Sequence, residues 1–206
     1  ETDDAPGLQQ LLAATDWQGG SLSRGASHTE SLAVVPAAYG MLQLAGQAAW
    51  NDTSVLQRLY PLFRAYALVV AYGSPQVMAP LLRGSAVLPL VMAEPGALGV
   101  EQSYRQLKHM AVHAGLQCTV ASVVQPGPSE ARRANAARVA LDALQNCASM
   151  HLGHAPRTTI VRAGSPQDVQ RLALQLLENA CTMGTGMPAL PPHRHPEPAA
   201  HFVRSH

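Results

Sequence analysis

Histidine and serine side chains are the groups in this sequence with the clearest chemical potential. His109 and His113 lie four residues apart in a helical pattern, so one metal ion could bind both rings. No Glu-x-x-His context accompanies them, and we expect them on a solvated helix flank. Ser74 follows an apolar run where a nucleophile could lie, but the pattern lacks the G-x-S-x-G elbow and indicates a loop serine.

The C-terminal segment 184–206 is rich in proline and histidine, with the run Pro192–Pro196 followed by His201 and His206. Flexible histidine tracts bind Ni²⁺, Cu²⁺ or Zn²⁺ weakly, which leaves a metal-handling protein as one alternative function. Because the segment lacks apolar periodicity, we expect a flexible tail attached to an α/β domain over residues 1–183.

Composition argues against several classes of function. The 206 residues carry 14 Lys and Arg against 13 Asp and Glu, so no basic field is available for nucleic acid. The longest apolar runs, such as Ser85–Ala93, are far shorter than the roughly 20 residues of a membrane span. The acidic start, Glu1–Asp4, lacks the apolar region of a signal peptide. Three widely spaced cysteines, Cys118, Cys147 and Cys181, are typical of reduced residues, so we expect a cytoplasmic protein.

Apolar periodicity predicts alternating helices and strands. In the first part of the chain, Gly7–Leu12 favours a short helix and Leu32–Pro36 the end of a strand. Residues 55–63 have the spacing of one helix face, and Pro61 should kink that helix.

Two apolar runs, Tyr66–Tyr72 and Ala86–Met92, are typical of strands buried on both faces of a parallel sheet. Pro75–Leu82 between them favours a short helix. Pro89 is unusual inside the second run, because proline has no N–H group for the ladder.

The second half of the chain predicts two more strands and three more helices. Helices are expected over 99–114 and after Ser129, and strands over Gln117–Val124 and Arg157–Arg162. A last helix begins at Ser165, and we expect its apolar stripe to be core. That stripe consists of Val169, Leu172, Ala173, Leu176, Leu177 and Ala180.

From about Gly7 to Cys181 the order of these features resembles the MinD/ParA group of P-loop ATPases. It is closest to the flagellar-number regulator FlhG and the cellulose-secretion ATPase BcsQ. The segment Leu32–Gly40 is similar to that family's strand that ends in a Pro-Ala loop. Phe63–Pro75 is similar to its Walker B strand, and Ala86–Met110 to the strand, Glu-Pro turn and helix that follow. The resemblance implies an α/β fold, with a mostly parallel sheet flanked by helices on both faces and incomplete at the N-terminus.

The nucleotide-handling residues of that family are replaced or missing in this sequence. No G-x-x-x-x-G-K-[ST] loop is present, and the one lysine, Lys108, falls inside a helix pattern. Tyr72 stands where the resemblance places the Walker B aspartate, and a phenol cannot organise Mg²⁺ as a carboxylate does. Ser122 or Val123 stands where it places the adenine-contacting asparagine. We expect no catalytic residue and no cofactor, unless ATP and Mg²⁺ bind a loop upstream of Glu1.

Two explanations of these departures remain open. The chain could be a degenerate, non-hydrolysing member of the family, which we favour because a missing upstream segment does not account for Tyr72. Alternatively, it could be part of an ATPase whose phosphate-binding loop precedes Glu1. Under the favoured explanation the protein is a regulatory or partner-binding protein of a bacterial membrane-associated machine, either flagellar or cellulose-secreting, with only indirect membrane association.

The partner-binding surface is expected at the loops that follow the predicted strands, since α/β proteins bind ligands there. Tyr39, Tyr72 and Leu98 lie in these loops and are the expected anchors, since buried aromatic side chains dominate interface energies. The resemblance implies a protein partner at this face, either a second copy of the chain or an active paralogue. Arg132, Arg133 and Arg138 are expected to be ordinary helix surface.

Overall fold

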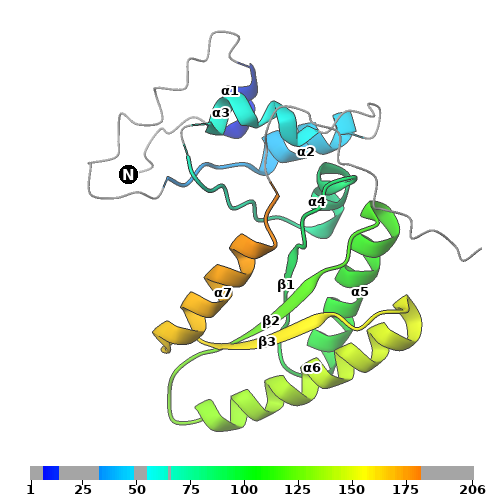
Figure 1. Ribbon diagram of the computed structural model, residues 1–206, viewed down its shortest axis with the longest axis vertical. Coiled ribbons are helices and arrows are strands. Elements are labelled where there is room, and N and C mark those ends of the chain that lie inside the picture. The colour runs from blue at the N-terminus through cyan, green and yellow to red at the C-terminus, as the bar shows by residue number, and fades with distance from the viewer. Residues whose placement is uncertain (1–6, 14–32, 49–54, 65, 182–206) are drawn as a thin grey trace, which may run out of the picture.

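The computed structural model describes residues 7–13, 33–48, 55–64 and 66–181 (Figure 1). The elements in chain order are α1 (Leu8–Ala13), α2 (Ala38–Ala48), the 3₁₀ helix η2 (Val55–Arg58), α3 (Tyr60–Phe63), α4 (Pro75–Leu82), β1 (Leu90–Met92), α5 (Ala97–Ala114), β2 (Thr119–Val124), α6 (Glu130–Leu152), β3 (Arg157–Arg162) and α7 (Pro166–Glu178). The predicted tail, 184–206, and the predicted loop before residue 33 lie outside the described residues.

Three parallel strands in the order β1-β2-β3 form the sheet of the described chain. Helices α5 and α6 connect them and cover one face, and α7 lies on the other face (Figure 1). Successive crossovers of the same hand place both connecting helices on the same side of a parallel sheet. The predicted α/β class with a parallel sheet is confirmed.

The main core lies between the sheet and the pair α5 and α6. Val91 and Val120 are register partners, so both side chains point to the same face, where they pack in one cluster with Leu107 and Leu144. The apolar periodicity of these two helices also predicts inward-facing stripes that include Leu107, Met110, Leu141 and Leu144, and all four side chains are buried. Complete burial of an aliphatic side chain of this size stabilises the folded state by roughly 1.5–3 kcal/mol.

Two glycines near the ends of helix α5, Gly99 in its first turn and Gly115 at its C-terminal cap, are required by the local geometry. A Cβ atom on Gly99 would overlap the carbonyl group of Glu94, so the turn after β1 can pack directly against the first turn of α5. Gly115 has a φ of 69°, in the left-handed region, and its N–H bonds to the carbonyl oxygen of Ala111. The predicted stop of this helix at Gly115 is confirmed.

The N-terminal helices form a second apolar cluster above the sheet (Figure 1). Helices α1 and α2 cross at Gly40, where an added Cβ would lie 2.7 Å from Cγ of Leu8. Helix α2 was not predicted, although Met41, Leu44 and Ala45 carry the buried spacing of a helix. The predicted break near Pro61 is confirmed, because η2 ends before the separate helix α3 begins.

The predicted strand Tyr66–Tyr72 is wrong for the described chain. Residues 67–73 form no regular secondary structure, and their backbone groups make no hydrogen bonds to other described residues. Leu68, Val70 and Tyr72 are exposed rather than buried. The predicted strand Ala86–Met92 is shortened to Leu90–Met92, because Pro89 offers only its carbonyl oxygen to the ladder, where it accepts a hydrogen bond from the N–H of Thr119 at 2.9 Å.

The expected burial of the apolar stripe on α7 is also wrong. Asp168 is the buried residue of this helix, and Val169, Leu176 and Leu177 are exposed. The reason is the way the helix is held, since Asp168 bonds to β3 and thereby turns a polar side of α7 toward the sheet. The predicted start of the helix is confirmed: the hydroxyl of Ser165 accepts a hydrogen bond from the N–H of Asp168 at 3.3 Å.

Candidate functional site

The carboxyl ends of the three parallel strands lie at one edge of the sheet, where α/β proteins commonly bind ligands. The turns after β2 and β3 lead directly into the N-termini of α6 and α7. Between these two turns lies an open hollow of about 450 Å³. Its lining residues are Pro126, Glu130, Arg162, Gly164, Ser165, Pro166 and Gln167.

Arg162 is the arginine that lines this hollow, and its guanidinium group is paired with the carboxylate of Asp168. The backbone N–H of Arg162 and its Nε donate to Oδ2 of Asp168 at 3.1 and 2.8 Å, and Arg171 donates to Oδ1 at 3.1 Å. The side-chain hydrogen bond from Arg162 is the largest cause that lowers the pKa of Asp168, and it raises the pKa of Arg162. Asp168 is therefore an ionised anchor between β3 and α7.

The remaining lining groups are also used by the local structure. Ser165 caps α7, and its hydroxyl lies 3.3 Å from Oε1 of Gln167. Arg133, beside the hollow, donates to the carbonyl oxygens of Gln125 and Pro126 at 2.8 and 3.3 Å and so holds the turn after β2. No described residue of the lining pairs a nucleophile with a base. Glu130 is the carboxylate of the lining, and its charge contributes to raising the pKa of Arg162.

The three predicted partner-binding residues are all accessible. Tyr39 is 76% exposed, Tyr72 93% and Leu98 75%. Tyr39 lies in the first turn of α2 and Tyr72 lies just before α4, and these two helices pack against each other. Leu98 lies in the first turn of α5, after the carboxyl end of β1. The expected common edge therefore holds for Leu98, whereas Tyr39 and Tyr72 belong to the helical layer beside the sheet.

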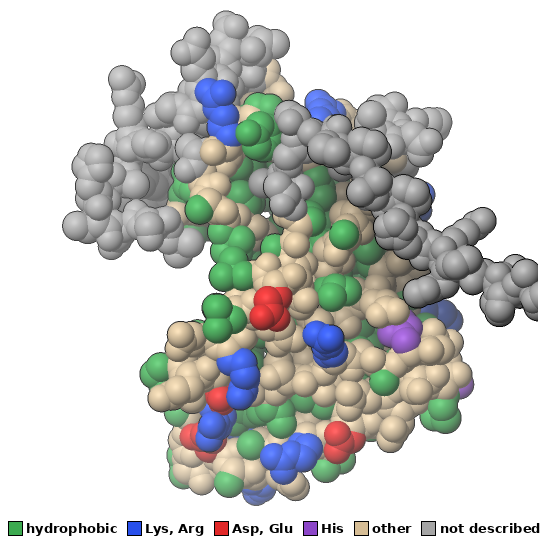
Figure 2. All heavy atoms as spheres, in the orientation of Figure 1, with side chains coloured by type: hydrophobic (Ala, Val, Ile, Leu, Met, Phe, Trp, Pro, Cys, Tyr) green, Lys and Arg blue, Asp and Glu red, His purple; other side chains and the backbone are tan. Residues whose placement is uncertain are grey.

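Apolar side chains form much of the surface around Tyr72. Leu68 and Val70 precede it on the same segment and are exposed, and Val34, before α2, is exposed as well. Figure 2 shows apolar side chains on the flank between the N-terminal helices and α7, whereas most of the charged side chains lie in the lower half of the view. An exposed apolar area on an otherwise folded chain is a common sign of an interaction site.

The histidine pair of α5 is close but incomplete as a metal site. The ring centroids of His109 and His113 lie 4.3 Å apart, and the pKa of His109 is lowered, first by burial and then by His113. Within the described ranges no group of three or more potential metal-ligating side chains is present. The histidines of the C-terminal segment lie outside the described residues; they are His193, His195, His201 and His206.

Ser122 and Val123 mark the position at which the resemblance places an adenine-contacting asparagine. Ser122 is buried in β2, and its Oγ has no partner among the described residues. Val123 points to the opposite face of the sheet and is partly exposed. Neither side chain offers the paired donor and acceptor of an amide.

Ser74, the residue weighed as a nucleophile, is the exposed N-cap of α4.

Comparisons with protein-family models, with curated proteins and with solved structures find no match to this chain. None of the helices in the described ranges combines the length and the apolar character needed to cross a membrane.

Sequence reasoning missed the turn Ala163–Ser165, which forms one side of the hollow. The same rule that selected the turns after the other strands applies to β3, and the pattern Ser165-Pro166 already marked a helix start there. The exposure of the α7 stripe was also missed. The available signal was Asp168, a carboxylate six residues after Arg162, although periodicity alone gives no reason to pair them.

Proposed function

We propose that this protein is a non-hydrolysing regulatory protein of the MinD/ParA-like fold that works by binding protein partners. Its setting in this proposal is the bacterial cytoplasm, beside a membrane-associated flagellar or cellulose-secreting machine. The observation that carries the proposal is the exposure of the apolar segment 66–72, which ends at Tyr72. An uncharged, β-branched and aromatic segment that is unpaired in the isolated chain is suited to binding a partner strand or apolar surface.

Tyr72 also supports binding over turnover. It stands where the resemblance places a Mg²⁺-organising carboxylate, and its phenol is almost fully exposed. In the described chain no acid–base pair lines the hollow at the carboxyl edge of the sheet. Under this proposal, the surface around Tyr72 binds a partner and does not take part in phosphate chemistry.

An ATPase completed by a phosphate-binding strand from outside this chain is a second candidate. One observation favours it: β1 is an edge strand of the described sheet, and segment 67–73 has unpaired backbone groups. A strand from elsewhere could satisfy both. Steady-state ATP hydrolysis measured with Mg²⁺ separates the two candidates, since turnover above background that is lost on changing a residue of this chain would support the ATPase.

The experiment that tests the binding proposal is site-specific photocrosslinking in living cells. A photoreactive residue replaces Tyr39, Tyr72 or Leu98 in turn, and the matched control replaces Val139, which is 61% exposed on α6. We expect crosslinks to a protein partner from the three predicted sites and none from position 139. Alanine substitutions of the same three residues should weaken binding of the partner so identified by about tenfold or more at the strongest anchor.

The opposite pattern would refute the proposed surface. If crosslinks arise from position 139 or from the outer face of α6 near Arg138, and the three alanine variants bind the partner normally, Tyr39, Tyr72 and Leu98 do not form the interface.

A further inference from the structure

Helix α7 carries its apolar half on the outside of the molecule. Successive residues of an α-helix turn by about 100°, which divides α7 into two halves of different character. The outward half carries Val169, Leu174, Leu176 and Leu177, with Gln170 as its one polar side chain. The charged residues Asp168, Arg171 and Glu178 all lie on the other half. Leu174 and Leu177 are 54% and 51% exposed, so the surface of this helix away from the sheet is accessible and uncharged.

The orientation of α7 is fixed at both ends, so the helix cannot simply turn its leucines inward. At the N-terminal end, Asp168 accepts hydrogen bonds from the backbone and side chain of Arg162. At the C-terminal end, the carbonyl oxygen of Asn179 accepts a hydrogen bond at 3.0 Å from the N–H of Leu88, just before β1. Helix α7 thus crosses the sheet from the end of β3 to the start of β1.

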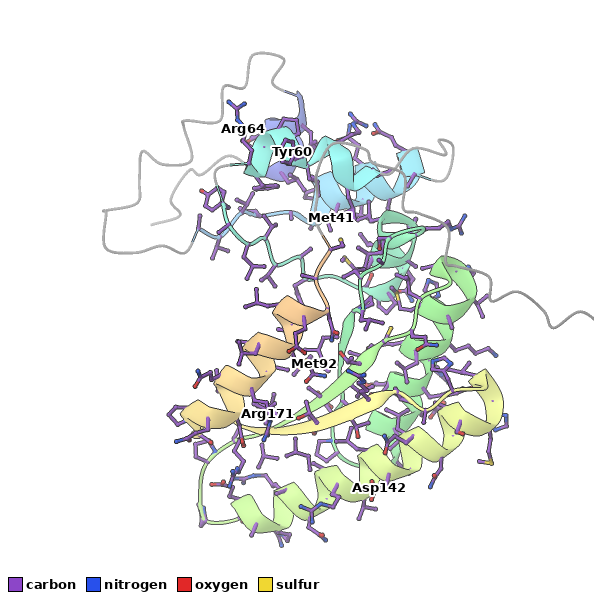
Figure 3. The ribbon with its side chains drawn as sticks, in the orientation of Figure 1. Met41, Tyr60, Arg64, Met92, Asp142 and Arg171 are labelled. Carbon is purple, nitrogen blue, oxygen red and sulfur yellow. The ribbon has the colours of Figure 1, made fainter. Side chains whose placement is uncertain are left out.

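This diagonal crossing leaves one apolar corner of the same sheet face uncovered. Met92 at the end of β1 is 46% exposed, and Val123 near the end of β2 is partly exposed. Met92 points to the face opposite α5 and α6, because its neighbour Val91 packs into the main core. Val123 shares the face of Met92, because Met92 is the register partner of Ala121 and side chains alternate along β2. Figure 3 shows Met92 between β1 and α7. The outward half of α7 and this corner therefore lie on the same side of the molecule.

We infer that this side of the molecule pairs with a second copy of the chain through α7. The α7 surface is defined here as Val169, Leu174, Leu176 and Leu177 together with Met92 and Val123. In a twofold arrangement the α7 helices of two copies pack against each other with their apolar halves facing. The inference concerns a surface separate from Tyr39, Tyr72 and Leu98, and it stands independently of the proposed function.

A second copy fits the chemistry of this surface better than a lipid bilayer does. A twofold interface must be self-complementary, and an uncharged apolar half-helix satisfies that condition without any opposing charge. The net charge of +1 gives two copies no strong long-range repulsion. A membrane-surface helix usually has lysine and arginine on its polar face, whereas the one arginine of α7, Arg171, is paired with Asp168.

The surface is modest in size, which sets the expected affinity. Helix α7 has 13 residues and is about 20 Å long, so a pair of such helices buries less than the roughly 800 Å² per partner of a standard interface. We therefore expect a dimer with a dissociation constant on the order of 1–10 µM.

The test is sedimentation velocity on the full chain between about 0.5 and about 100 µM. The test variant combines Leu174→Lys and Leu177→Lys, two positions already half exposed in the monomer. The matched control is Val139→Lys on α6. We expect the wild type and the control to dimerise, and the double variant to show a dissociation constant raised at least about tenfold with an unchanged circular dichroism spectrum. The single variant Leu177→Lys provides the same comparison should the double variant fail to fold.

Three results would overturn the inference. A wild type that stays monomeric throughout this range excludes self-association through α7. A lysine variant that folds and dimerises like the wild type places the interface elsewhere. A monomeric wild type that sediments with vesicles of phosphatidylcholine and phosphatidylglycerol, and loses this binding in the lysine variant, assigns the α7 surface to a lipid interface.

Discussion

At the scale of single residues, two side chains show how burial and hydrogen bonding set chemical behaviour in this chain. Cys118 is buried in the main core beside the start of β2. Burial raises the pKa of its thiol to about 11, because the thiolate would lose its hydration. Asp168 has the opposite shift, since the hydrogen bonds from Arg162 stabilise its ionised form. The folded state therefore favours the neutral thiol of Cys118 and the ionised carboxylate of Asp168.

Cys118 should resist thiol reagents in the folded protein. At pH 8 we expect Cys147 and Cys181, which are partly accessible, to react with a chromogenic disulfide, and Cys118 to react only in denaturant. The shift also predicts an alkaline effect on stability. Between pH 9 and about pH 11 the unfolded chain loses this proton first, so the free energy of unfolding falls as the pH rises through this range.

Denaturant titrations of the wild type and of Cys118→Ala at several pH values measure this contribution. The alanine variant should be less stable at pH 8 and lose less stability between pH 9 and pH 11. Equal losses in the two proteins would show that the thiol of Cys118 ionises equally well in the folded state.

Asp168→Asn should weaken the attachment of α7 at neutral pH. The lowered pKa means that Asp168 stabilises the fold above its unfolded pKa of 3.8, and that this contribution disappears as the pH falls through the folded pKa. We expect a lower melting temperature than the wild type at pH 7 and a smaller difference near pH 3. Melting curves followed by circular dichroism test this, and a difference that is constant with pH would rule out the ionised carboxylate as the cause.

At the scale of elements, the helices on the two faces of the sheet have opposite roles. Helices α5 and α6 bury their apolar stripes against the sheet and form the main core. Helix α7 is held by hydrogen bonds that the buried carboxylate of Asp168 accepts from Arg162, and it exposes Leu174, Leu176 and Leu177. Helix α7 thus contributes to stability in a different way from α5 and α6, although all three have apolar periodicity.

The contrast between these helices predicts two different mutational effects. Leu144→Ala in α6 removes a fully buried side chain and should cost about 2–5 kcal/mol in the free energy of unfolding. Leu174→Ala in α7, measured at a concentration where the chain is monomeric, should change it by less than about 0.5 kcal/mol. Urea titrations provide both values. A large loss at position 174 in the monomer would mean that α7 packs its leucines inward.

The features of the fold that depend on neighbouring residues could be predicted from the sequence, whereas those that depend on distant contacts could not. The helix ends at Gly115 and Ser165 and the strand Arg157–Arg162 were predicted, because turn, cap and pattern signals are local. The burial of the Tyr66–Tyr72 run and of the α7 stripe was mispredicted. Apolar periodicity shows that a surface avoids water, but it does not identify what covers that surface, and here the described chain does not cover it.

At the scale of the whole molecule, the two apolar clusters are connected by a narrow bridge. Leu56 and Met78 are the partly buried residues that pack against both the sheet cluster and the N-terminal cluster. Beside this bridge, segment 66–72 links the N-terminal helices to α4 without a place in the sheet. This segment and the outward half of α7 are the two apolar surfaces left open in the described chain, and exposed apolar areas of this kind often mark interaction sites.

Amide hydrogen exchange of residues 67–72 tests this account most directly. In the isolated full chain we expect these amides to exchange at nearly the rate of an unstructured peptide, while the amides of β2 remain strongly protected. Addition of the partner identified by photocrosslinking should then slow amide exchange in residues 67–72. Protection of residues 67–72 as strong as that of β2 in the isolated chain would show a buried, paired strand, and would remove the exposed surface on which the proposed binding function rests.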